Sequence, residues 1–139
     1  MSIMTDSPST RSVVEPEQLR VDGVRRLIAS ATAFHEALAF PLRDPQTGDP
    51  VWATASMAEI VRGSHLAFAR LLPADRAEQA SARLERATRE LYTTVRELAQ
   101  VLPGAKQAWI VPIRRMSEIT GLTVHTLRQI ALSDSGPPA

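Results

Sequence analysis

Apolar residues recur along the chain at spacings of three and four, which is the period of amphipathic helices. The first helix is expected to begin near Pro16, because proline suits the first turn of a helix. A second is expected from about Ser56 to Leu72, with Ser56 as its N-cap and Glu59 three residues later, as in a capping box. The stripes that these helices would bury are Val24, Leu27, Ala31, Phe34 and Leu38, widened by Leu19 and Ile28, in the first, and Met57, Ile60, Val61, Ser64, Ala67, Phe68 and Leu71 in the second.

A third, longer helix is expected from Ala74 to about Leu102. Its apolar side has the spacing of a heptad seam, formed by Leu84, Thr88, Leu91, Val95, Leu98 and Leu102. The seam has two interpretations: packing within one subunit, or a homodimer interface at Leu84, Leu91, Val95 and Leu98. We favour the homodimer interface. The stripe would then pack against helices of its own subunit and also against the second chain, in one bundle made by two chains. Arginines and acidic residues occur in equal number on the outer faces of this helix, which predicts a solvated surface with local ion pairs.

The segments around these helices have no periodic pattern. Residues 1–14 and 133–139 are rich in small and polar residues, so both are expected to be flexible tails. Residues 41–55 contain three prolines and predict a loop, and Pro103 and Gly104 are expected to end the third helix, with a helical turn following within residues 104–111. No pair of strands is expected. The prediction is therefore an all-α fold, with a helical bundle and dimerisation segment at residues 15–102 and a helix-turn-helix at residues 103–132.

Residues 113–132 have the pattern of two short helices that meet at Gly121. Glycine readily adopts the positive φ that such a turn needs, and Ser117 is small enough for a close crossing of the helices. Thr123 would cap the second helix through its hydroxyl. The residues expected to pack between the two helices are Met116, Ser117, Thr120, Leu122, Leu127 and Ile130.

Around Gly121 these residues resemble the helix-turn-helix of bacterial and phage transcription regulators, most closely the lac repressor and MerR families and the last helices of sigma-factor-like domains. The resemblance covers residues 113–132. It implies that the second helix lies in the major groove of DNA, with base contacts from Val124, His125 and Gln129. It also implies contacts to the DNA backbone from Arg114, Arg115, Thr123, Thr126 and Arg128.

Charge and composition narrow the range of functions. The formal net charge is only +1, but four basic and two acidic residues lie within residues 103–139, so any affinity for nucleic acid would be strongest at this end. The absence of cysteine excludes disulfides and thiolate chemistry. Residues 1–14 are too polar for a signal peptide, and no apolar run approaches the ~20 residues of a membrane span. We therefore expect a cytoplasmic protein without a membrane partner.

Catalytic and cofactor sites are not indicated. His35 and His65 fall on different predicted helices, and no two histidines have the spacing of metal ligands on one helix. The chain contains no glycine-rich phosphate loop and no set of nucleophile and base. We therefore expect neither an enzyme nor a bound metal or cofactor.

These features predict a small sequence-specific protein of a bacterium, phage or plasmid that binds double-stranded DNA and regulates transcription as a homodimer. The alternative is a helical protein–protein interaction module without DNA binding. Ile119 favours this alternative, because it occupies a position that is often polar in such motifs, and the low net charge also favours it. A weaker third hypothesis is a helical metal or small-ligand protein that uses His35 and His65.

Overall fold

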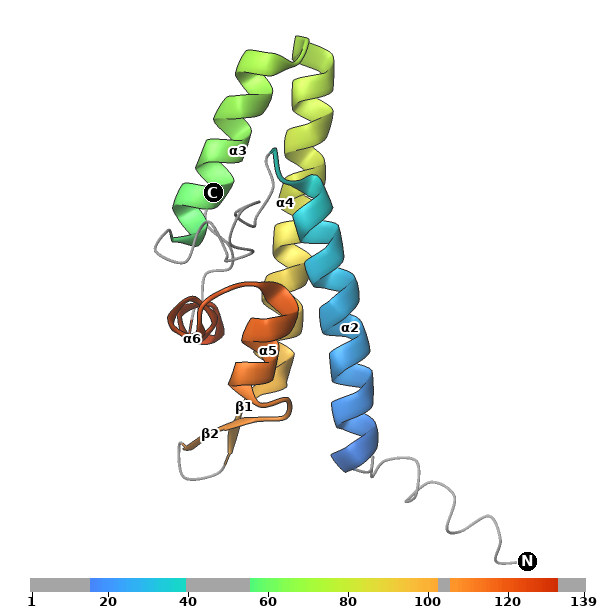
Figure 1. Cartoon of the computed structure of the whole chain (residues 1–139), viewed down its shortest axis with the longest axis vertical. Helices are drawn as coiled ribbons and strands as arrows, with labels where there is room; N and C mark the ends of the chain where they lie inside the picture. Colours follow the sequence, from blue (N-terminus) through green and yellow to red (C-terminus); the bar gives the residue numbers. More distant parts are fainter. Residues whose placement is uncertain (1–15, 40–55, 103–105, 133–139) are drawn as a thin grey trace, which may run out of the picture.

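The computed structural model describes residues 16–39, 56–102 and 106–132, and within them the chain is helical apart from one short β-ribbon (Figure 1). The predominantly helical fold that the spacing of apolar residues predicted is therefore confirmed. The predicted tails at residues 1–14 and 133–139, and the predicted loop at residues 41–55, lie outside the described residues. The helices are α2 (Pro16–Ala37), α3 (Met57–Leu71), α4 (Ala74–Leu98), α5 (Ile113–Thr120) and α6 (Val124–Leu132).

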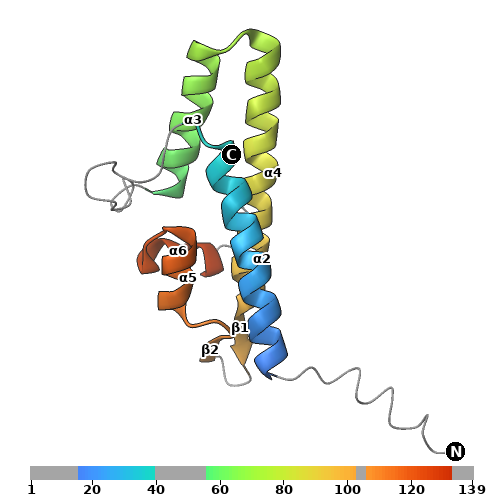
Figure 2. The same ribbon diagram turned by 45° about the vertical axis from the view of Figure 1, so that its right-hand side comes forward.

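The central helix of the fold is α4. Helices α2, α3 and α6 all pack on it, while α5 packs on α2 and α6. In Figure 1, α2 lies to the right of α4, whereas α3 and α6 lie to its left, with α3 above α6. Figure 2 shows the same order of α3 above α6. The two C-terminal helices therefore pack on α2 and on the lower part of α4.

A single buried cluster joins the N-terminal and C-terminal parts of the chain. It contains Leu27 and Phe34 of α2, Leu91 of α4 and Leu127 of α6. Burial of large apolar side chains such as these stabilises a fold by roughly 1.5–3 kcal/mol each. Because the cluster is shared, the orientation of α6 is coupled to the packing of the whole bundle.

The predicted heptad seam lies inside this cluster. Leu84, Leu91 and Val95 have no exposed surface and Leu98 is 1% exposed, in a single copy of the chain. Thr88 tolerates burial because its hydroxyl donates to the carbonyl oxygen of Leu84 at 2.7 Å. The chain's own helices cover the seam, so these four apolar residues are not available on its surface to a second copy. A homodimer stays a prediction, and it would need another surface.

The predicted end of the third helix is wrong, because α4 ends at Leu98 and the chain turns into a β-ribbon. Strand β1 (Ala99–Leu102) pairs antiparallel with strand β2 (Lys106–Trp109), and Ile110 N donates to the carbonyl oxygen of Leu98 at 2.9 Å. The predicted helical turn in residues 104–111 and the expected absence of a strand pair are therefore wrong as well. Leu102 precedes Pro103, and a residue before a proline disfavours helical backbone, which accounts for the extended conformation of Leu102 itself.

The buried face of α2 is narrower than predicted. Leu19 and Ile28, which were expected to widen it, are 39% and 47% exposed. Ile28 lies about 100° around the helix from the fully buried Leu27, which places it beyond the sector that α4 and α5 cover. The periodicity located the stripe, but the neighbouring helices set its width.

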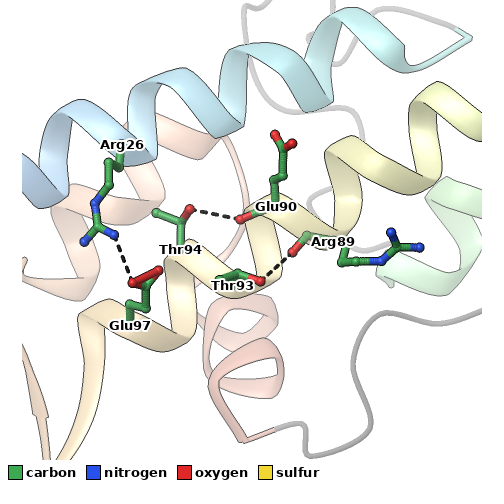
Figure 3. A network of polar contacts seen from close by, with 6 residues as sticks. All are labelled: Arg26, Arg89, Glu90, Thr93, Thr94 and Glu97. Atoms are coloured by element: carbon green, nitrogen blue, oxygen red, sulfur yellow. Dashed lines mark hydrogen bonds and ion pairs between the residues drawn. The ribbon is translucent and has the colours of Figure 1, made fainter.

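The junction of α2 with α4 is polar on its outer side (Figure 3). Arg26 Nη1 of α2 lies 2.9 Å from Glu97 Oε2 of α4, and both side chains are about half exposed. Thr93 and Thr94 donate to the carbonyl oxygens of Arg89 and Glu90. Within the described residues no ion pair joins two side chains of α4, so the predicted local pairs along this helix are wrong. Exposed charges such as these contribute little to stability.

Gly23 permits close approach of α2 to the end of α4. A β-carbon at this position would overlap with the side chain of Leu98, and it would also touch Val111. Glycine within a helix destabilises it by about 1 kcal/mol relative to alanine, and here the tight packing of two helices compensates. Gly23 is therefore buried where α2 meets the end of α4.

Candidate nucleic-acid interface

Two short helices, α5 and α6, meet at the glycine that the sequence pattern singled out. Gly121 adopts φ 74° and ψ 5°, the left-handed conformation that favours glycine, and its N–H donates to the carbonyl oxygen of Ser117 at 2.9 Å. Figure 1 shows α5 upright and α6 seen along its axis, so the helices cross steeply. The predicted role of Gly121 as the turn residue agrees with this geometry.

Hydroxyl groups stabilise the turn from both sides. Ser117 Oγ donates to the carbonyl oxygen of Leu122 at 2.6 Å. Thr120 Oγ1 donates to the carbonyl oxygen of Met116 at 2.8 Å and accepts from Leu122 N at 3.1 Å. Because Thr120 and Leu122 are buried, these bonds satisfy backbone groups that water cannot reach.

Thr123 and Thr126 form the first turn of α6. Thr123 Oγ1 accepts from Thr126 N at 3.1 Å, which is the bond of an N-cap residue, and it donates to Thr126 Oγ1 at 2.9 Å. Thr126 is only 7% exposed. Its predicted contact to a DNA backbone is not supported by this placement, because the side chain faces the interior and bonds to Thr123. Thr123 itself is half-buried.

One face of α6 is open to solvent. His125, Arg128 and Gln129 are exposed, and their spacing of three and four places them on one side of the helix. The opposite side carries Leu127 and Ile130, which are almost completely buried. The predicted base contacts His125 and Gln129 therefore share an open face with the predicted backbone contact Arg128. The remaining predicted base contact, Val124, is half-buried.

Leu132 is a member of this face that the sequence analysis missed. It is 69% exposed at the end of α6 and follows His125 by seven residues, or two helical turns. The seven-residue spacing was the signal that could have identified it. An exposed leucine beside polar side chains adds an apolar contact to whatever this face binds.

Arg114 and Arg115 begin α5 on its exposed side. Arg115 Nη1 lies 3.3 Å from Glu118 Oε1, whereas Arg114 has no ion pair within the described part of the chain. Both side chains remain able to reach a phosphate, because an exposed ion pair holds a side chain only weakly. Ile119, by contrast, is half-buried and packs against the core.

His35 links α2 to the turn between α5 and α6, and the sequence analysis did not assign it this role. Its Nε2 lies 2.7 Å from the carbonyl oxygen of Thr120, the last residue of α5. A carbonyl oxygen can only accept, so Nε2 must carry the hydrogen. The two residues are 85 positions apart, and no local pattern could have paired them.

Replacement of this histidine provides a test of the link. His35→Phe keeps a ring beside Phe34 but removes the donor to a buried carbonyl group, so we expect a loss of about 1–3 kcal/mol in the free energy of unfolding. Amide hydrogen exchange at residues 121 and 122 should become faster. His65→Phe is the control, because His65 contacts α4 and not the turn. Its Nδ1 lies 2.7 Å from Ser81 Oγ of α4. Equal exchange at the turn in both variants would refute the role of His35.

The histidines do not meet. His35 faces Thr120 and His65 faces Ser81, and within the described residues no three His, Cys, Asp or Glu side chains are grouped as metal ligands.

Among the residues that the structure describes, no helix has both the length and the apolar character that a membrane span requires.

Tyr92 and Arg96 form a second polar feature of α4. Tyr92 is buried, and the Arg96 guanidinium carbon lies 5.7 Å from the centroid of its ring. Burial raises the pKa of Tyr92 above its ordinary value of 10.0, and the positive charge of Arg96 opposes this shift. The folded protein therefore holds the phenolic proton more firmly than the unfolded chain does.

This pKa predicts how stability changes at alkaline pH. The contribution of the protonated Tyr92 to the free energy of unfolding is fully present below pH 10. It is lost as the pH rises through the raised pKa of the folded state. Tyr92→Phe should reduce the loss of stability between pH 9 and pH 11, measured by urea denaturation, relative to the unchanged protein. Since Tyr92 is the chain's single tyrosine, its absorbance gives the pKa directly, and a value at or below 10 would contradict the prediction.

Comparison with known proteins found no matching family model, no matching curated protein and no matching solved structure.

Proposed function

We propose that this protein binds duplex DNA sequence-specifically through the open face of α6 and acts as a small transcriptional regulator. One observation carries the proposal: His125, Arg128 and Gln129 share a single exposed face of a helix whose opposite face is held in the core. Gln129 and His125 match base edges in the major groove, since glutamine pairs with adenine and histidine can donate to guanine, and Arg128 matches a backbone phosphate beside them. An α-helix fits the width of that groove.

The hydrogen bonds that hold α6 in place favour discrimination between DNA bases. The N-cap at Thr123 and the hydrogen bonds around Gly121 set the direction of α6 relative to α5. A rigid helix loses less conformational entropy on binding than a mobile one, which favours discrimination between bases. Arg114 and Arg115, at the start of α5, would contact phosphates on the flank of the groove.

The regulator would act by binding alone, either by blocking access to a promoter or by recruiting another protein. With the few cations around α6, we expect only modest affinity for nonspecific DNA. A homodimer would raise the affinity by placing two copies of α6 on half-sites one helical turn of DNA apart. We propose that the protein belongs to a bacterium, phage or plasmid and that this homodimer binds DNA in the cytoplasm.

Selection of bound duplexes from a random pool tests this function. The expected result is one enriched motif, palindromic if two chains bind together, whose affinity falls as salt concentration rises. Failure to enrich any motif over several rounds at low salt would refute sequence-specific DNA binding.

A protein-interaction module is the second proposal, and Leu132 favours it. This exposed leucine extends the face of α6 with an apolar contact that DNA offers only at thymine methyl groups. If α6 binds a protein, a stoichiometric partner should be recovered whose binding is lost in Leu132→Asp, while no duplex motif is enriched.

A further inference from the structure

The hairpin of α3 and α4 extends beyond the end of α2. Figures 1 and 2 both show its upper part with no third helix alongside. Near the end of α2, Ala39 N donates to Ser64 Oγ of α3 at 3.2 Å, and Ser64 is completely buried. Two turns further along α3, Leu71 is 78% exposed. Of the described helices, only α3 and α4 therefore form the tip of the bundle.

An open apolar surface lies on α3 at this tip, and we call it the α3 shelf. Its residues enclose a depression of about 370 Å³ and are Gly63, Leu66, Ala67, Arg70 and Leu71. Leu66 is 56% exposed. Gly63 and Ala67 are one turn apart on the same side of the helix, and side chains this small allow another helix to approach closely. The shelf thus presents exposed apolar and small side chains on one side of α3.

The charges around the α3 shelf are positive. Arg62 and Arg70 lie one turn before and one turn after Leu66, both are exposed, and within the described residues neither has an ion-pair partner. Glu59 lies a further turn away, and its carboxylate accepts from Ser56 Oγ at the N-cap of α3. No ion pair within the described residues therefore neutralises the cations beside the shelf.

This charge pattern argues against a second copy as the occupant. In a symmetric antiparallel pair of α3 helices centred on Leu66, Arg62 of one chain would lie opposite Arg70 of the other, at both ends. Like charges held opposite one another oppose association. A partner with carboxylates at the same spacing would instead gain charge-assisted hydrogen bonds from both arginines.

We infer that the α3 shelf binds an acidic amphipathic helix of another protein. The partner helix lies along α3, with apolar side chains on Leu66 and Leu71 and carboxylates on Arg62 and Arg70. This surface is on α3 and does not include the open face of α6, so the inference does not depend on DNA binding.

A library of displayed helical peptides with randomised faces, selected against the full chain, tests the inference. The enriched peptides are expected to carry apolar residues at helical spacing together with Asp or Glu. Binding of a synthetic enriched peptide, followed by fluorescence anisotropy, should weaken at least tenfold in Leu66→Ser/Leu71→Ser and in Arg62→Glu/Arg70→Glu. All four side chains are exposed, so these variants are expected to fold, and circular dichroism checks this.

The matched controls are Leu132→Ser on α6 and Arg86→Glu on the outer side of α4, which remove an exposed leucine and an exposed arginine elsewhere. Both should leave peptide affinity unchanged. The inference is overturned if the enriched peptides lack acidic residues, or if their binding is unaffected by the shelf variants. It is also overturned if sedimentation shows a dimer that Leu66→Ser/Leu71→Ser dissociates, because a second copy would then be the occupant.

Discussion

Leu91→Ala is expected to lower the free energy of unfolding by about 2–5 kcal/mol. Leu91 has no exposed surface and lies midway along the seam of α4, in the cluster shared with α2 and α6. Its truncation removes apolar contacts and leaves a cavity that the surrounding helices fill only in part. Urea denaturation followed by circular dichroism measures the loss.

Two further measurements distinguish this core role from a dimer interface. Leu66→Ala is the control, because the same truncation at a 56% exposed position should change stability by less than about 0.5 kcal/mol. If the seam packs within one chain, the loss in Leu91→Ala should be the same at low and high protein concentration. A loss that disappears at high concentration would instead assign the seam to a contact between chains.

Arg128→Ala combined with Gln129→Ala is expected to weaken binding to the selected DNA motif at least about thirtyfold. The predicted base contact of Gln129 is worth about 1–3 kcal/mol, and loss of the predicted backbone contact of Arg128 adds to it, which together correspond to this factor or more. Both side chains are exposed and no hydrogen bond or ion pair within the described residues involves them, so the fold should be unaffected. Anisotropy titrations with the selected duplex and a scrambled duplex measure the change at fixed salt.

Gln79→Ala combined with Arg86→Ala is the matched control for this prediction. It removes the same two kinds of side chain from exposed positions on α4. The control should bind the selected duplex as the unchanged protein does, with the same preference over the scrambled duplex. Equal affinities in both double variants would show that the open face of α6 does not read DNA.

Features that depend on near neighbours in the chain were predicted well. Pro16 begins α2, and Ser56 caps α3 by accepting from Glu59 N at 3.2 Å, as the capping-box pattern indicated. Gly121 has the positive φ that the turn requires, and Thr123 caps α6. Caps and turns are formed by hydrogen bonds that span only a few residues, so local sequence is sufficient to predict them.

The errors have a different origin. The apolar spacing continued through Leu102 and suggested a longer helix, although Pro103 disfavours helical backbone at the residue before it. Strands of four residues are too short for a reliable alternation of polar and apolar positions. The homodimer interface stays a prediction, because a periodic pattern does not show whether helices of the same chain or of a second chain cover the stripe.

By itself, the sequence determined which segments are helical, the N-caps at Ser56 and Thr123 and the glycine turn, because these depend on contacts within a few residues. Only the tertiary structure decided which faces stay open. It buried the seam and Thr126, left His125, Arg128 and Gln129 exposed, and brought His35 to Thr120 across 85 positions. The physical reason is that exposure of a helix face depends on where other helices begin and end. The α3 shelf is open because the described helices cover the other side of α3.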